Sequence, residues 1–174
     1  MNLKIGYVKD SLQIFFWLVC IESIFKVSTA YTKETEVEGV NEFFSIYLEQ
    51  KDQEKLVENI SKDVRSFQYV NIELVANMFN TVRNTVAHEG IYWMFTFPTK
   101  KGDSLINVIP KEKTSFFSTY TMGEENLDTY TISIIKEEVR TMIVRGSLNY
   151  LENVITILMG RNHIKLCFLV IILN

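Results

Sequence analysis

The sequence is poor in residues that interrupt regular structure, with two prolines and seven glycines among 174 residues. Glycine and proline supply the backbone conformations of tight turns. Their scarcity therefore favours long regular elements over a turn-rich β fold. The length fits a single domain with one hydrophobic core.

Cysteine and histidine are also scarce. The chain holds two cysteines, Cys20 and Cys167, and two histidines, His88 and His163. Two cysteines so far apart do not make a disulfide framework in a chain of this length. The dispersed cysteines and histidines do not predict a structural zinc site. This usage is typical of a protein of the reducing cytoplasm, and no metal or other cofactor is expected.

Positive charge is not in excess, because 18 lysines and arginines stand against 21 acidic residues, for a net charge of −3. Such a chain has no overall positive field to attract nucleic acid. Any contact to phosphate must therefore come from a local cluster.

No apolar run is long enough for a confident membrane span, which takes about 20 residues. The run at residues 11–21 resembles a signal peptide, but Asp10 and Glu22 at its edges favour a buried helix. The apolar tail at residues 165–174 is a final core strand or helix, unless it marks a truncated reading frame. No stable membrane association is expected.

Helical periodicity is the main positive signal. Apolar residues recur at steps of three and four along four segments, which predicts amphipathic helices at about residues 3–31, 40–67, 70–88 and 125–158. The charged middle of the second segment, residues 49–55, is a solvated break or a surface turn. The stretches IYWMFTF, PTKKGDS and LINVI predict a β-hairpin at about 91–110, and residues 114–122 add a third strand or a loop. The predicted fold is mainly α, an antiparallel helical bundle with a small β-hairpin insertion.

The predicted helix at residues 70–88 carries a polar face. On a wheel with about 100° per residue, Asn84 and His88 point away from the apolar stripe and are neighbours one turn apart. The amide is thus placed to orient the imidazole. Arg83 lies on the flank, about 140° from His88. For both to hold one phosphate, the helix must break near His88, Arg83 must wrap around, or a second copy must supply the missing group.

The stretch RNTVAHEG, residues 83–90, resembles the signature of the HEPN superfamily of nucleotide-binding domains. That signature is an arginine, a polar residue, a few further residues and a histidine. Arg83, Asn84 and His88 match these positions, with four residues between arginine and histidine. The motif covers six residues, and the helical setting agrees loosely over the rest. The predicted hairpin departs from the simplest family members.

The resemblance implies a HEPN-like fold and a metal-independent endoribonuclease, commonly a toxin or phage-defence effector. It also implies a homodimer with the site at the interface, RNA as substrate and an antitoxin protein as a further partner. Carried over, His88 is the general base or acid, Arg83 holds the scissile phosphate, and Asn84 positions either group. DNA lacks the 2′-hydroxyl and is expected to resist cleavage.

Weaker candidates for contact with RNA surround this motif. Asn80 and Thr81 lie about one turn before Asn84, where they line an RNA groove or a polar dimer seam. Tyr92 and Trp93 follow the motif and either stack a base or fill the hairpin core. Cations that guide the RNA backbone are predicted in the hairpin turn and on the last helix: Lys100, Lys101, Arg140 and Arg145.

Two other functions stay open. A non-catalytic dimeric adaptor of the same fold is expected to keep its biological activity when His88 is replaced by alanine. A helical membrane-surface or scaffold protein accounts for the aromatic N-terminal run and the apolar tail, and is expected to fractionate with membranes.

Overall fold

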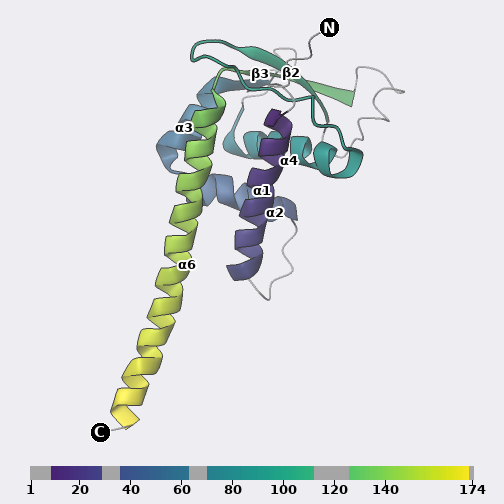
Figure 1. Ribbon diagram of the computed structural model, residues 1–174. Helices are drawn as coiled ribbons and strands as arrows, with labels where there is room; N and C mark the ends of the chain where they lie inside the picture. Colours follow the sequence, from purple (N-terminus) through teal and green to yellow (C-terminus); the bar gives the residue numbers. More distant parts are fainter. Residues whose placement is uncertain (1–8, 29–35, 63–69, 112–125, 173–174) are drawn as a thin grey trace.

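Helices make up most of the described chain, and a small sheet lies at one end of them in the computed structural model (Figure 1). The structure describes residues 9–28, 36–62, 70–111 and 126–172. The mainly α class is therefore confirmed. The alternative of a third strand or a loop at residues 114–122 lies outside the described residues.

Helix α1 (Lys9–Ser28) is formed by the N-terminal apolar run, as predicted, and one of its faces is buried while Phe16 on another is 59% exposed. Its buried apolar side chains recur at steps of three and four, the period of one helix face: Ile14, Leu18, Ile21 and Phe25. Asp10, at its first turn, is also buried. Its carboxylate accepts a hydrogen bond from the backbone N–H of Phe97 at 3.0 Å and pairs with Lys136 Nζ at 3.0 Å. The start of α1 thereby holds two later parts of the chain.

The single helix predicted at residues 40–67 is divided into α2 (Glu36–Glu42), a short π-helix (η1, Phe43–Tyr47) and α3 (Gln50–Asn59). Leu48 and Glu49 have extended backbone conformations, so the break falls at the first residue of the charged stretch, and the rest of that stretch lies in α3. After α3 the chain becomes strand β1 (Ile60–Lys62). The helical prediction is wrong at Ile60–Lys62 because these residues pair with a distant strand.

The sheet consists of β1, β2 (Leu105–Pro110) and β3 (Leu127–Ile132) in the order β1-β3-β2, with both pairings antiparallel. The predicted hairpin is wrong in its pairing, because β2 pairs with β3 and residues 91–97 form no strand. Instead, the backbone N–H of Phe95 donates to the hydroxyl of Ser11, and the backbone N–H of Phe97 donates to the carboxylate of Asp10.

Helix α6 (Lys136–Ile172) begins later than the predicted residue 125, because residues 127–132 form the central strand. The first half of α6 packs against the other elements through the buried side chains of Val139, Met142 and Tyr150. Its C-terminal half extends well beyond the rest of the molecule (Figure 1).

The approach of α6 to the π-helix depends on Gly146. A Cβ atom there would lie 2.8 Å from Leu48 Cδ2 and 2.9 Å from Phe43 Cζ. We expect Gly146→Ala to lower the free energy of unfolding by about 1–3 kcal/mol, measured by urea denaturation, because overpacking outweighs the better helix propensity of alanine. Gly39→Ala is the control, since its Cβ would meet only Phe25 at 3.9 Å. A stabilised Gly146→Ala variant would contradict this close contact.

Candidate functional site

Helix α4 (Ile72–Glu89) carries the predicted motif, and its two ends are fixed by local signals. The Asn71 side chain caps its start by accepting a hydrogen bond from Leu74 N at 2.8 Å. Gly90 ends it in the left-handed conformation, with φ of 66°, a geometry that glycine adopts without strain. The helix predicted at residues 70–88 is confirmed. His88 therefore lies in the last turn of α4.

The buried face of α4 is wider than the predicted apolar stripe. The helix contacts α1, α2, α3 and β2. A narrow polar strip of α4 remains accessible to solvent and consists of Asn77, Thr81, Asn84 and His88. Asn80 was expected to point outward but is 6% exposed, so it cannot contact RNA in this conformation. The prediction failed because a wheel assigns one apolar face, whereas neighbours cover α4 on several sides.

Arg83 is buried rather than exposed on the flank. Its Nη2 lies 2.7 Å from Glu22 Oε2 on α1, and its Nη1 donates to Asn84 Oδ1 at 2.7 Å. The side chains of Arg83 and Glu22 are only 10% and 8% exposed. Burial strengthens such a pair and makes an unpaired member costly. Arg83 thus links α4 to α1 and fixes the orientation of Asn84.

Sequence reasoning missed Glu22 as part of this cluster. Glu22 was interpreted only as a charged residue at the edge of an apolar run. It follows Leu18 by four residues and precedes Phe25 by three, so it falls on the buried face of α1. A carboxylate on a buried face needs a partner, and this was the available signal.

Asn84 and His88 lie on the strip of α4 that remains accessible. Asn84 is half-buried and His88 is exposed. Because Oδ1 of Asn84 accepts this hydrogen bond, the two N–H donors of the same amide take no part in it. The two residues stand about 6 Å apart along the helix axis. The structure therefore brings Arg83 and Asn84 into contact and places His88 one turn beyond them.

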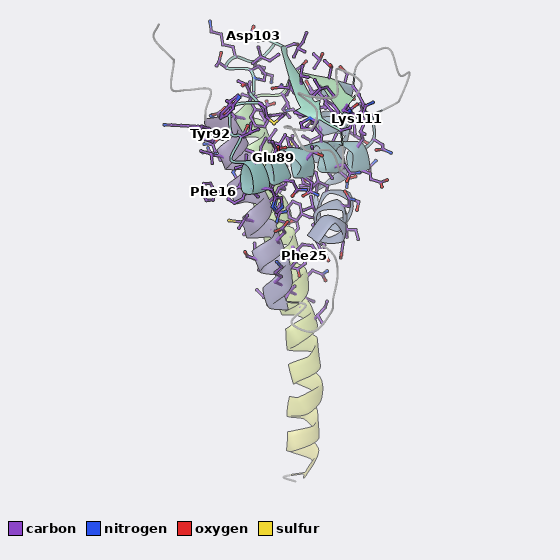
Figure 2. All side chains as sticks on the ribbon, turned by 90° about the vertical axis from the view of Figure 1, so that its right-hand side faces the viewer. Phe16, Phe25, Glu89, Tyr92, Asp103 and Lys111 are labelled. Atoms are coloured by element: carbon purple, nitrogen blue, oxygen red, sulfur yellow. The ribbon has the colours of Figure 1, made fainter. Side chains whose placement is uncertain are left out.

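Tyr92 and Trp93 are exposed just beyond the end of α4, at 39% and 57%. Their rings meet edge to face, with centroids 5.3 Å apart. They do not fill a hairpin core, since no hairpin forms here. The Cα atoms of His88 and Tyr92 are at most about 14 Å apart along four residues of chain. Figure 2 shows Tyr92 and Glu89 at the same end of α4.

A cavity of about 470 Å³ lies between α4 and the sheet, and Asn77 and Thr81 line it from the polar strip of α4. Thr81, a predicted substrate contact, donates its hydroxyl to Asn77 O at 2.9 Å. Across the cavity, Lys62 pairs with Asp128 at 2.8 Å and lies 5.7 Å from the centre of the Tyr130 ring. The polar strip thus runs from this cavity to His88.

The predicted guiding cations do not gather at the end of α4. Lys100 belongs to a turn in which the backbone N–H of Asp103 donates to the carbonyl oxygen of Lys100. Figure 2 shows Asp103 well apart from Glu89. Lys101, in the same turn, lies 3.7 Å from Glu138 at the start of α6.

The two predicted arginines of α6 differ in their surroundings. Arg140 is exposed, whereas Arg145 binds Asp52 on α3 at 2.6 Å and lies 3.7 Å from Glu49. A hydrogen bond from Lys51 holds the pKa of Glu49 below its ordinary value, and the nearby charge of Arg145 acts in the same direction. Arg145 is therefore a link between α6 and α3 rather than a free cation.

Among the residues that the structure describes, no three histidine, cysteine or acidic side chains are grouped to hold a metal ion. Within the same residues, no helix combines the length and apolarity that crossing a membrane requires. Comparisons of the chain with protein-family models, with curated proteins and with solved structures found no match. Function is therefore inferred from the residues at the end of α4.

Proposed function

We propose that this chain is a metal-independent endoribonuclease of the HEPN type, with its site on the accessible face of α4. The observation that supports the proposal is the placement of Asn84 and His88, one turn apart, with Asn84 held by Arg83 and His88 open to solvent. The exposed rings of Tyr92 and Trp93 offer faces on which bases stack, worth about 1–3 kcal/mol per base.

In the proposed reaction, His88 removes the proton from a ribose 2′-hydroxyl, and the 2′-oxygen attacks the adjacent phosphorus. The bond to the 5′-oxygen breaks, which leaves a 2′,3′-cyclic phosphate and a 5′-hydroxyl end. The leaving oxygen takes a proton from an imidazolium, the acid counterpart of the first step. The N–H donors of Asn84 bind a non-bridging phosphate oxygen, where negative charge increases in the transition state.

The role of Arg83 in this proposal differs from the one that the resemblance implies. Its guanidinium already binds Glu22 and Asn84, so it supports Asn84 rather than gripping phosphate. We therefore assign Arg83 as a positioning residue. The proposal needs no phosphate contact from a buried side chain.

A homodimer completes the proposal. When the ends of α4 from two copies face each other, one His88 serves as the base and the other as the acid. The exposed Tyr92 and Trp93 lie on the surface that such a contact would use. In the cell, the proposed role is a cytoplasmic toxin or phage-defence effector, which an antitoxin protein would silence by covering this face.

A non-catalytic dimeric adaptor is the second candidate, and the Arg83–Glu22 pair favours it. Both terminal nitrogens of the guanidinium are bonded within the chain, which is typical of a structural arginine. In this case, the α4 face binds a partner without cutting it. Expression of the His88→Ala variant in bacteria would then have the same biological effect as expression of the wild type.

A comparison of RNA with DNA as substrate tests the enzymatic proposal. We expect the purified protein to cut a labelled single-stranded RNA in the presence of EDTA and to leave DNA of the same sequence intact, because only ribose supplies the nucleophile. A DNA strand with one ribonucleotide should be cut only on the 3′ side of that nucleotide, as read on a denaturing gel. Equal cleavage of DNA and RNA would contradict the proposal. Intact RNA together with an undiminished effect in bacteria would favour the adaptor.

A further inference from the structure

The cavity of about 470 Å³ between α4 and the sheet has the size of a small-molecule site, which is usually about 300–1,000 Å³. Met78, Ile109 and Tyr130 line it, and these side chains are only 1–4% exposed. Leu74 and Pro110 add further apolar surface to the lining. A flat ring that enters the cavity can therefore bury one of its faces against apolar side chains.

The charged side chains that line the cavity balance one another. Lys62 and Lys111 are matched by Glu73 and Asp128, and Lys62 already pairs with Asp128 at 2.8 Å. The lining therefore has no excess of positive charge with which to hold a phosphate group. The group that fits here is expected to be neutral.

Asn77 supplies hydrogen-bonding groups to this cavity that the described chain does not use. No described residue forms a hydrogen bond with its side-chain amide, which offers an acceptor oxygen beside two N–H donors. Thr81, one turn later, donates its hydroxyl hydrogen to Asn77 O at 2.9 Å, so the Thr81 oxygen can only accept. The α4 side of the cavity thus provides an acceptor beside a donor, and one further acceptor.

Adenine is the base that matches these groups. Asparagine pairs with adenine through two hydrogen bonds, in which the amide oxygen accepts from N6 and the amide N–H donates to N7. The second hydrogen on N6 then remains for the Thr81 oxygen. Guanine and uracil carry a carbonyl oxygen in place of this amino group, and cytosine covers less of the apolar lining because it has one ring. We propose that the cavity binds an unpaired adenine base.

The cavity lies in line with His88 along α4. Asn77 and His88 are eleven residues apart, close to three turns, so they lie within about 20° of each other around the helix and about 16 Å apart along it. In Figure 2, α4 extends from Glu89 toward the side on which Lys111 lies at the cavity. At about 3.4 Å per stacked nucleotide, this distance corresponds to about five nucleotides of one strand, and to fewer in an extended strand. The adenine is therefore assigned to the RNA strand that His88 cuts, an assignment that rests on the proposed function.

Binding of fluorescently labelled 2′-O-methyl oligouridine tests the cavity without cleavage. We expect one adenine among the uridines to raise the affinity by about 5- to 150-fold, the range for one asparagine–adenine pair. Replacement of that adenine by 7-deazaadenine, which lacks N7, should remove most of this gain. The Asn77→Ala variant should lose the gain and still bind the all-uridine strand as the wild type does. Asn153→Ala is the matched control, because Asn153 is an exposed asparagine of α6, and it should keep the gain.

Cleavage of oligouridine RNA with a single adenine tests the alignment of the cavity with His88. We expect a preferred cut at a constant offset of no more than about five nucleotides from the adenine, and the cut should move when the adenine is moved. At saturating protein concentration, Asn77→Ala should cut the same RNA without a preferred position. Circular dichroism checks that each variant is folded.

Several outcomes would overturn the adenine site. These are the absence of any gain in affinity from the adenine, or a gain that survives Asn77→Ala. Adenosine monophosphate that binds as tightly as the adenine-containing strand would assign the cavity to a free nucleotide and contradict its assignment to RNA. Adenine-dependent binding without cleavage would support the cavity and contradict the nuclease, whereas cleavage without adenine dependence would do the reverse.

Discussion

Replacement of His88 by alanine is expected to lower the rate of RNA cleavage by about 10²–10⁴-fold, the usual contribution of a general acid or base. Alanine removes the group that carries the proton but leaves the fold intact, because His88 is exposed. The thermal unfolding midpoint should therefore stay unchanged. Single-turnover rates on a fluorophore–quencher RNA measure the effect.

The matched control for this variant is His163→Ala. The chain has only these two histidines, so the pair of variants asks which imidazole supports cleavage. The rate of His163→Ala should equal that of the wild type. A His88→Ala protein that cuts at the wild-type rate would place the chemistry elsewhere or assign it to a contaminating nuclease.

The second large effect is expected at Glu22. Glu22→Ala should lower the free energy of unfolding by about 3–5 kcal/mol, because it leaves the Arg83 guanidinium buried without its carboxylate. Urea denaturation followed by circular dichroism measures this change. Lys51→Ala is the control, since it breaks a solvent-exposed pair with Glu49 and should cost less than about 1 kcal/mol. A loss at Glu22 as small as that at Lys51 would show that the buried pair contributes little.

The double variant Glu22→Leu/Arg83→Leu distinguishes a role of Arg83 in positioning Asn84 from a direct role of Arg83 in catalysis. Removal of both charges avoids the buried guanidinium without its carboxylate that Glu22→Ala leaves, so the double variant should be more stable than Glu22→Ala. If Arg83 only positions Asn84, this variant should retain more RNA cleavage than His88→Ala does. A loss as deep as that of His88→Ala would instead assign Arg83 a direct contact with phosphate.

Much of α4 is predictable because its signals are local. The cap at Asn71, the stop at Gly90 and the apolar period between them all lie within the helix. The strands are less predictable, because their partners are distant in sequence. Ile60 and Leu105 both pair with Ile132 of β3, and residues 127–132 fit a helical period until those partners are known.

The residues of the candidate site also differ in whether local or distant parts of the sequence determine their placement. A wheel is sufficient to place His88 and Asn84 on an accessible strip. The burial of Arg83 depends on Glu22, which is 61 residues away, and no periodicity within α4 indicates it. The sequence does not indicate the exposure of Trp93 either, because this exposure arises where the predicted strand does not form.

The most direct test of the α4 site is an NMR titration of the isotope-labelled protein with a 2′-O-methyl RNA, which can bind but lacks the nucleophile. We predict that the resonances of Asn84, His88, Tyr92 and Trp93 shift together and saturate at one affinity. Saturable shifts confined to other surfaces, with these four residues unmoved, would contradict the proposed site.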